Sequence, residues 1–194
     1  MAGGSSSSSV CCGVGVLVLL AVLFVAVVTE ADDTGISPLL PVCKTVGGGS
    51  YYFDVQFCVS ALGSDDRSLN AERYRDFSAI AVDLVTANAT STAAKIDGLI
   101  KGGSRGNNDE AMKRCFRSCQ VLYRGILQRQ PGCAAAVKDG KFSDATASLE
   151  KSAAAAKECE GGFSKSNVTS PVLAEDDSAF KLAKLAVALL RFAY

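Results

Sequence analysis

The feature that most constrains the fold of this sequence is a helical repeat of apolar residues in four successive segments. They begin near residues 70, 107, 143 and 178, and the last runs to about 194. Apolar side chains spaced every three or four residues share one face of an α-helix, and no segment of convincing length has the two-residue period of a strand. Four amphipathic helices with short links predict an all-α protein, an antiparallel four-helix bundle. The expected inner faces include Phe77, Ile80, Ile96, Phe116, Cys119, Tyr123, Ile126, Leu149, Ala153, Ala156 and Cys159.

Ahead of these segments, two short apolar stretches surround Cys43 and Cys58, with a Gly-rich link between them. This arrangement predicts a small hairpin, at about 37–63, that is closed by a disulfide. We expect Ser50 to cap the second arm and Gly63 to end it. The bundle then occupies about 68–194.

Local signals predict where the bundle helices begin and end. Asn107, with Glu110 three residues later, is typical of a helix N-terminus, and Ser143 predicts the cap of the third helix. We expect the third helix to end at Gly161-Gly162. The acidic residues Glu175, Asp176 and Asp177 suit the start of the last helix, from about Ser178, because negative charge is stabilised there.

Pro131 and Gly132 lie inside the segment that forms the second bundle helix. An interior proline removes a backbone hydrogen bond and costs about 3 kcal/mol. The sequence therefore predicts an interruption and a kink, with residues 134–138 continuing at a changed angle.

Residues 1–31 have the composition of a secretory signal peptide. An apolar run from Val10 to Val28 precedes the small residues typical of a cleavage site, so we expect cleavage after Ala31 and a mature domain of 32–194. The run lacks a preceding Lys or Arg and approaches the length that spans a bilayer, so an uncleaved anchor is the alternative. In both cases the remainder enters the secretory pathway, where disulfides persist.

The composition argues against catalysis. No histidine occurs in 194 residues, which removes the usual general base of hydrolases and the commonest metal ligand. Glu, Lys or Tyr could act as acid or base, but no residues assemble into a recognisable catalytic site. The sequence predicts a protein that is not an enzyme, binds another protein, and needs no cofactor and no metal.

Charge is balanced, with 20 basic and 20 acidic residues. We interpret the basic residues as interleaved with acidic ones along the helices, on solvated faces. Nucleic acid binding needs clustered Lys and Arg, so no nucleic acid partner is expected.

Six cysteines follow the signal segment: Cys43, Cys58, Cys115, Cys119, Cys133 and Cys159. They allow fifteen full pairings. Cys119 and Cys159 are spaced to join neighbouring antiparallel helices. Eighteen helical residues would hold Cys115 and Cys133 about 27 Å apart, so free or intermolecular states are favoured for both. A metal site at Cys115 and Cys119 lacks a second ligand pair of fitting spacing.

Several motifs together resemble the plant invertase and pectin methylesterase inhibitor family, over nearly all of residues 41–194. They are the Cys-x14-Cys hairpin at Cys43 and Cys58, the Cys-x3-Tyr element at Cys119 to Tyr123, and the helix end Glu158-Cys159-Glu160-Gly161-Gly162-Phe163. The phrases 57–63 (FCVSALG) and 168–172 (VTSPV) are similar to the invertase inhibitor branch that includes a tree-pollen allergen.

The resemblance implies a four-helix bundle with an N-terminal helical hairpin and disulfides Cys43–Cys58 and Cys119–Cys159. It also implies a secreted, extracellular inhibitor of a carbohydrate-active enzyme of the cell wall, with the vacuole as an alternative location. Pro131-Gly132 and the additional Cys115 and Cys133 depart from the family pattern.

Members that inhibit invertase share a Pro-Lys-Phe turn between the second and third bundle helices. The matching residues here are Gly140, Lys141 and Phe142, with glycine in place of proline. A lysine between the two carboxylates of a glycosidase cleft, beside an aromatic anchor, would be complementary in charge. We expect Gly140 to make the turn more flexible. The alternative is that these residues have no inhibitory role: Lys141 is solvated, and Phe142 packs onto the third bundle helix.

Invertase (β-fructofuranosidase) is therefore the slightly favoured target. In the alternative, a polar face of the second and third bundle helices fills the cleft of pectin methylesterase (pectinesterase). A third hypothesis is a secreted protein with no enzyme target. Sequons at Asn88 and Asn167 are candidate glycosylation sites, and Asn167 is favoured because it falls in a predicted loop.

Overall fold

The computed structural model describes residues 38–102 and 109–194, and these residues form helices and turns without a strand. The predicted signal peptide and the proposed cap at Asn107 lie outside the described residues. The helices are α1 (Leu39–Gly47), α2 (Val55–Gly63), a short 3-10 helix η1 (Asp66–Asn70), α3 (Tyr74–Gly102), α4 (Asp109–Lys138), α5 (Phe142–Lys165) and α6 (Leu173–Leu190).

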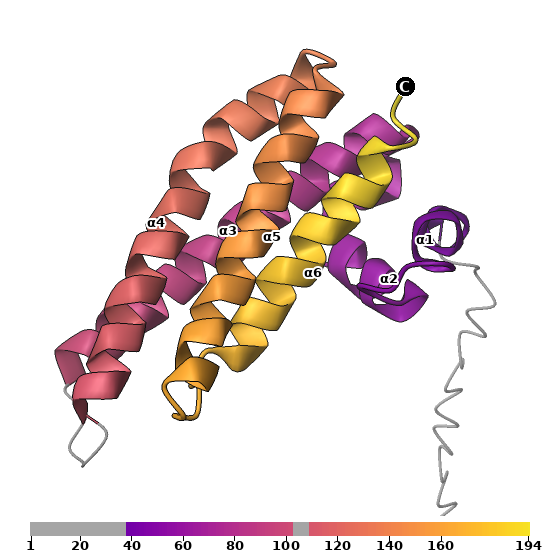
Figure 1. Cartoon of the computed structure of the whole chain (residues 1–194). Coiled ribbons are helices and arrows are strands. Elements are labelled where there is room, and N and C mark those ends of the chain that lie inside the picture. Colours follow the sequence, from indigo (N-terminus) through magenta and orange to yellow (C-terminus); the bar gives the residue numbers. More distant parts are fainter. Residues whose placement is uncertain (1–37, 103–108) are drawn as a thin grey trace, which may run out of the picture. The chain divides into compact units, whose positions relative to one another are not determined.

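The prediction of an all-α bundle is confirmed. Helices α3, α4, α5 and α6 pack as a four-helix bundle in which α4 lies between α3 and α5, and α6 closes the set against α5 and α3 (Figure 1). The bundle buries the apolar stripes that the sequence marks, and the largest fully buried side chains include Tyr123, Phe163, Ile96, Ile126, Leu149 and Leu185.

Three expected boundaries differ from the structure. Helix α5 begins at Phe142 with Lys141 at the N-cap position, so Ser143 is not the cap. It passes through Gly161 and ends at Lys165, before Asn167 adopts a positive φ of 54°. Gly161 does not have a positive φ, so it lacks the left-handed conformation that often ends a helix.

The last helix, α6, begins at Leu173 and not at Ser178. Its start therefore places Glu175 and Asp176 in the first helical turn, where the helix dipole favours negative charge. The acidic residues were correctly assigned to a helix N-terminus, although the helix begins earlier than expected.

The predicted interruption at Pro131 is wrong, because α4 is one unbroken α-helix with the proline inside it. Pro131 and Gly132 are both exposed, so the missing backbone donor falls on the solvent side of the helix. Curved helices open their hydrogen bonds on that side. Figure 1 shows the C-terminal part of α4 curving over towards α5.

Helices α1 and α2 form the N-terminal helical hairpin, and a disulfide joins Cys43 to Cys58 with a Cα–Cα distance of 5.5 Å. The cap of α2 is Asp54, whose carboxylate accepts a hydrogen bond from the Phe57 N–H at 2.7 Å. Ser50, the expected cap, instead accepts hydrogen bonds from the N–H groups of Tyr52 and Phe53 within the connecting turn.

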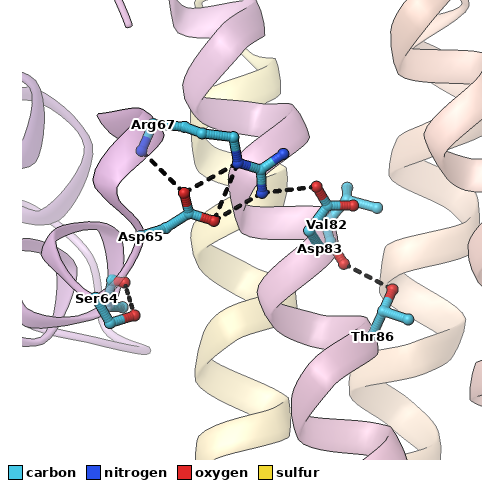
Figure 2. Close-up of polar contacts among 7 residues, drawn as sticks. Ser64, Asp65, Arg67, Val82, Asp83 and Thr86 are labelled. Atoms are coloured by element: carbon cyan, nitrogen blue, oxygen red, sulfur yellow. Dashed lines mark hydrogen bonds and ion pairs between the residues drawn. The ribbon is translucent and has the colours of Figure 1, made fainter. Parts of the chain in front are cut away.

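An arginine joins the hairpin to the bundle. Arg67, in η1, donates to both carboxylate oxygens of Asp65 and forms an ion pair with Asp83 of α3 at 2.8 Å (Figure 2). The guanidinium lowers the pKa of Asp65 through these hydrogen bonds. One side chain therefore fixes the segment after the hairpin against the first bundle helix.

The second disulfide, Cys119–Cys159, joins α4 to α5 with a Cα–Cα distance of 4.8 Å. Cys115 and Cys133 are free and buried, as expected from their separation along α4. The Cys133 thiol donates to the Ala145 carbonyl, and burial raises its pKa. Both free thiols therefore lie within the helix packing.

A buried polar pair crosses the bundle beside this disulfide. The Tyr123 hydroxyl of α4 donates to Asp176 of α6 at 2.6 Å, while the second Asp176 carboxylate oxygen is buried without a partner. Burial raises the pKa of Asp176 to about 7 against the opposing effect of the Tyr123 hydrogen bond, and Glu160 and Glu175 raise it further. The carboxyl group is therefore half protonated near neutral pH.

We predict that this carboxyl group makes the folded protein more stable in acid. An unfolded aspartate titrates near pH 3.9, so the folded state keeps a proton that the unfolded state has lost between about pH 4 and pH 7. The free energy of unfolding should fall by up to about 4 kcal/mol as the pH rises across this window, since one pKa unit is about 1.4 kcal/mol. Asp176→Asn should remove this part of the dependence in urea unfolding at pH 4.5 and 7.5. An identical pH slope in both proteins would contradict the assignment.

The two disulfides should differ in their contribution to stability. The Cys119–Cys159 bridge spans 40 residues and Cys43–Cys58 spans 15. The chain-entropy relation gives about 4 and about 3 kcal/mol respectively. Replacing each pair by alanine and measuring guanidinium unfolding should show the larger loss for Cys119–Cys159, and equal losses would argue against a loop-length effect.

Candidate functional site

The candidate inhibitory turn is the short connection between α4 and α5 that carries Gly140, Lys141 and Phe142. Three backbone hydrogen bonds close the preceding helix, and two of them define the geometry: Gly140 N–H donates to Val137 C=O at 3.2 Å, and Lys141 N–H to Ala136 C=O at 2.8 Å. This is the Schellman arrangement, which needs a left-handed residue after the helix end. Gly140 supplies it with φ of 73°.

The expectation that Gly140 loosens the turn is therefore wrong. A glycine at this position adopts the left-handed conformation without a steric penalty, and the neighbouring amides are hydrogen-bonded. A proline could not replace it, because its ring fixes φ near −65° and removes the N–H that bonds to Val137. The departure from the Pro-Lys-Phe pattern is thus a different way to build a defined turn.

Lys141 points its ammonium group into solvent. Its side chain is 65% exposed, and its one ion pair, with Asp139, is long at 3.8 Å and also exposed. Exposed pairs of this kind contribute little to stability. The charge is consequently available to a partner at a small cost.

Phe142 is buried, with 7% of its surface exposed. Its ring lies edge-on to the ring of Tyr194, with centroids 5.3 Å apart, whereas Tyr194 is itself 90% exposed. Phe142 therefore packs at the end of the bundle, against Tyr194 of the C-terminal segment, and offers little surface to a partner. This buried side chain holds the α4–α5 turn against the end of the bundle.

A groove of about 430 Å³ lies between the C-terminal part of α4 and the N-terminal part of α5. Its walls include Arg129, Lys151 and Asp144, and Gly132 lies at its edge. The Arg129 Nε is buried without a hydrogen-bond partner, and burial lowers the pKa of its guanidinium. This groove belongs to the polar face of the second and third bundle helices considered for pectin methylesterase.

A second cavity, of about 510 Å³, lies between the α1–α2 turn and α6. Lys184 sits at its wall, paired with Glu150 of α5 at 2.5 Å and 4.6 Å from the ring centroid of Tyr52. These contacts hold the hairpin turn against the bundle. Of the side chains that line this cavity, Lys184 and Glu150 are paired with each other, whereas Tyr51 is fully exposed.

The described residues contain no cluster of three or more side chains suited to hold a metal ion. Within the same ranges, no helix has the length and hydropathy needed to cross a bilayer. Asn167 lies exposed in the turn after α5, as expected, whereas Asn88 is half-buried on α3 and its backbone carbonyl accepts hydrogen bonds from Ser91 and Thr92.

Comparison with known proteins agrees with this architecture. The profile of the family described as "Plant invertase/pectin methylesterase inhibitor" matches residues 42–189. The chain belongs to this family. Its members inhibit invertase or pectin methylesterase and are not themselves catalysts.

Two curated relatives are named "Putative invertase inhibitor", one from Platanus orientalis and one from Platanus acerifolia. Each is 30% identical over 151 residues, which cover 77% of this chain and 85% and 81% of the relatives. Two crystal structures of a pectin methylesterase inhibitor from Arabidopsis share the fold. The first, a mutant form, has a TM-score of 0.66 at 17% identity and covers 81% of this chain and 98% of its own. The second has a TM-score of 0.59 at 16% identity and covers 80% and 95%.

The interpretation of the basic residues as interleaved with acidic ones is wrong for α4. From Ala111 to Lys138 this helix contains six of the 20 basic residues and none of the acidic ones. The lack of acidic residues in this stretch can be read from the sequence, but the equal totals of basic and acidic residues in the whole chain obscure it. In the structure Arg114, Arg117 and Arg124 are exposed, whereas Arg129 is half-buried.

We predict that the turn depends on glycine at position 140. Gly140→Ala should lower the free energy of unfolding by about 1–2 kcal/mol, because a Cβ is strained at positive φ. Gly140→Pro should cost more, since it also loses the bond to Val137. Gly132→Ala is the matched control: its Cβ would meet no atom within 4 Å, so it should be neutral or stabilising by up to about 1 kcal/mol. Urea unfolding measures all three, and equal effects at both glycines would refute the turn geometry.

Proposed function

We propose that this protein is a secreted, non-catalytic inhibitor of plant cell-wall invertase, a β-fructofuranosidase, and that the α4–α5 turn enters the enzyme's cleft. The observation that carries the proposal is the exposed Lys141 ammonium at the tip of a hydrogen-bonded turn. The two relatives named as invertase inhibitors support the choice of target.

The chemistry of a glycosidase explains why a lysine suits this position. Such enzymes hold two carboxylates within about 5–10 Å of each other across the scissile bond. A lysine ammonium between them would compensate their mutual repulsion and exclude substrate. In this arrangement Gly140 shapes the turn, Lys141 contacts the carboxylates, and Phe142 fixes the turn to the bundle.

Rigidity favours binding because less conformational entropy is lost when the complex forms. The turn is bonded to the last residues of α4, and Phe142 is buried directly behind it. The same surface can therefore be presented to the enzyme without ordering a flexible loop. This property supports an inhibitor that blocks a cleft by its shape and charge.

The proposed location is the cell wall, with the vacuole as the alternative. Two disulfides in a small helical protein are typical of an oxidising compartment, which the secretory pathway provides. The predicted signal peptide at 1–31 is the entry route. Asn167, exposed in a turn, is the favoured site for a glycan in this pathway, and Asn88 is the weaker candidate.

The decisive measurement is inhibition of purified cell-wall invertase by the mature protein, with sucrose as substrate. We predict dose-dependent inhibition, and for Lys141→Ala an inhibition constant at least about thirtyfold higher, the effect of a central interface residue. Lys138→Ala is the matched control, because this lysine is also exposed and lies three residues before Lys141. It should change the constant by less than about threefold. Equal losses for both lysines would refute a specific role for the turn.

The second candidate target is pectin methylesterase. The groove between α4 and α5 supports it, because Arg129 lines this groove without an ion pair among the described residues, and a guanidinium binds carboxylates well. A parallel assay of pectin demethylation distinguishes the targets. Inhibition there alone, reduced by Arg129→Gln and unchanged by Lys141→Ala, would replace the invertase proposal. Two unaffected enzymes would leave a secreted protein without an enzyme target.

A further inference from the structure

The outer face of α4 carries a row of arginines. Arg114, Arg117 and Arg124 are all exposed, and they follow one another at intervals of three and seven residues. At 100° per residue these intervals keep the three side chains on one side of the helix, opposite the buried Tyr123. We call these three residues the arginine row.

The row is linear and uncovered. With a rise of about 1.5 Å per residue, Arg114 and Arg124 are about 15 Å apart along the helix axis. Val121 lies between them and is 66% exposed. Helix α4 packs mainly against α3 and α5 and lies at the edge of the bundle in Figure 1, and the exposed side chains of the row face solvent.

The guanidinium groups of the row are unpaired within the described residues. None of the three forms an ion pair, a side-chain hydrogen bond or a ring contact there. Two acidic residues beside this part of α4 have other partners: Glu110, one turn before Arg114, pairs with Lys113, and Asp97 of α3 accepts a hydrogen bond from Gln120 of α4. The positive charge of this face is therefore not neutralised by the protein itself.

The concentration of charge is local. The whole chain has a formal net charge of zero, yet no acidic residue occurs between Ala111 and Lys138. Like charges along one helix repel one another, by a few tenths of a kcal/mol for each close pair. A bound polyanion would relieve that repulsion, whereas water and salt only screen it.

We propose that the arginine row binds a linear polyanion whose charges are carboxylates, such as a uronic-acid polysaccharide. A planar guanidinium forms two parallel hydrogen bonds with a carboxylate, which makes arginine better suited than lysine to such ligands. The groups stand in a line on a convex helix and not in a pocket. This shape suits an extended chain that repeats its charge along its length, and Val121 adds an apolar contact for a sugar ring.

The inference goes beyond the proposed inhibition of an enzyme and does not depend on it. The arginine row runs along the side of α4, whereas Lys141 lies beyond the end of that helix. Sucrose is neutral, so inhibition of invertase measured with sucrose reports the turn and not the row. Polymer binding would hold the protein at the surface where carboxylated polysaccharide is abundant.

The test is binding of the mature protein to sodium polygalacturonate, measured by isothermal titration calorimetry at low salt. In the arginine-row variant, Arg114→Gln/Arg117→Gln/Arg124→Gln, the dissociation constant should be at least tenfold higher. Lys44→Gln/Lys101→Gln/Lys165→Gln is the matched control, because it also removes three exposed charges, from other helices. It should change the constant by less than threefold. The affinity for polygalacturonate should also fall as salt is added, and it should fall less steeply for the arginine-row variant.

The proposal would be overturned if the unmodified protein did not bind polygalacturonate or if the two triple variants lost equal affinity. Equally tight binding of vesicles containing phosphatidylserine would also overturn it. Fully methyl-esterified polygalacturonate, which lacks the charge, should bind at least tenfold more weakly, and equal binding would exclude carboxylates as the recognised group. Circular dichroism of each variant confirms that the helices remain. If the arginine-row variant loses polymer binding but still inhibits invertase, polymer binding and invertase inhibition are separate properties.

Discussion

Everything else in this protein depends on the pairing of α4 with α5, which is fixed near both ends. At one end, the Schellman turn at Gly140 reverses the chain with two backbone hydrogen bonds. Towards the other, the Cys119–Cys159 disulfide holds the helices at a Cα–Cα distance of 4.8 Å. Because both restraints act on one antiparallel pair, the exposed turn and the outer face of α4 keep a constant geometry. Both proposed binding surfaces lie on this pair.

The remaining elements complete the bundle around that pair through one buried polar contact and one partly exposed ion pair. Tyr123 and Asp176 connect α4 to α6, and Lys95 of α3 pairs with Glu175 at 2.6 Å. Burying the Asp176 carboxyl group is costly when it is ionised, which explains the expected loss of stability as pH rises. A protein built in this way is suited to a mildly acidic compartment, where that group stays protonated.

Much of the fold could be predicted from the sequence, because helical periodicity reports burial directly. The stripe from Phe116 to Ile126 and the alanines Ala153 and Ala156 of α5 are buried as expected, and both disulfides form between the expected cysteines. Helix boundaries were less predictable. Ser50 and Ser143 have capping chemistry but do not cap, since the chain direction at these points follows from packing. Pro131 does not break α4 because the rest of the helix is held by its neighbours.

The sequence by itself determined the helical class, the disulfide framework and the residues available for binding, because periodicity, cysteine spacing and charge are local properties. Only the tertiary structure decided what those residues present. It buried Phe142 behind the turn, left Lys141 in solvent, and gave Gly140 the backbone angle that closes α4. It also left Arg114, Arg117 and Arg124 of α4 on one uncovered face. Exposure depends on which helices pack together, and that is a property of contacts between residues distant in the chain.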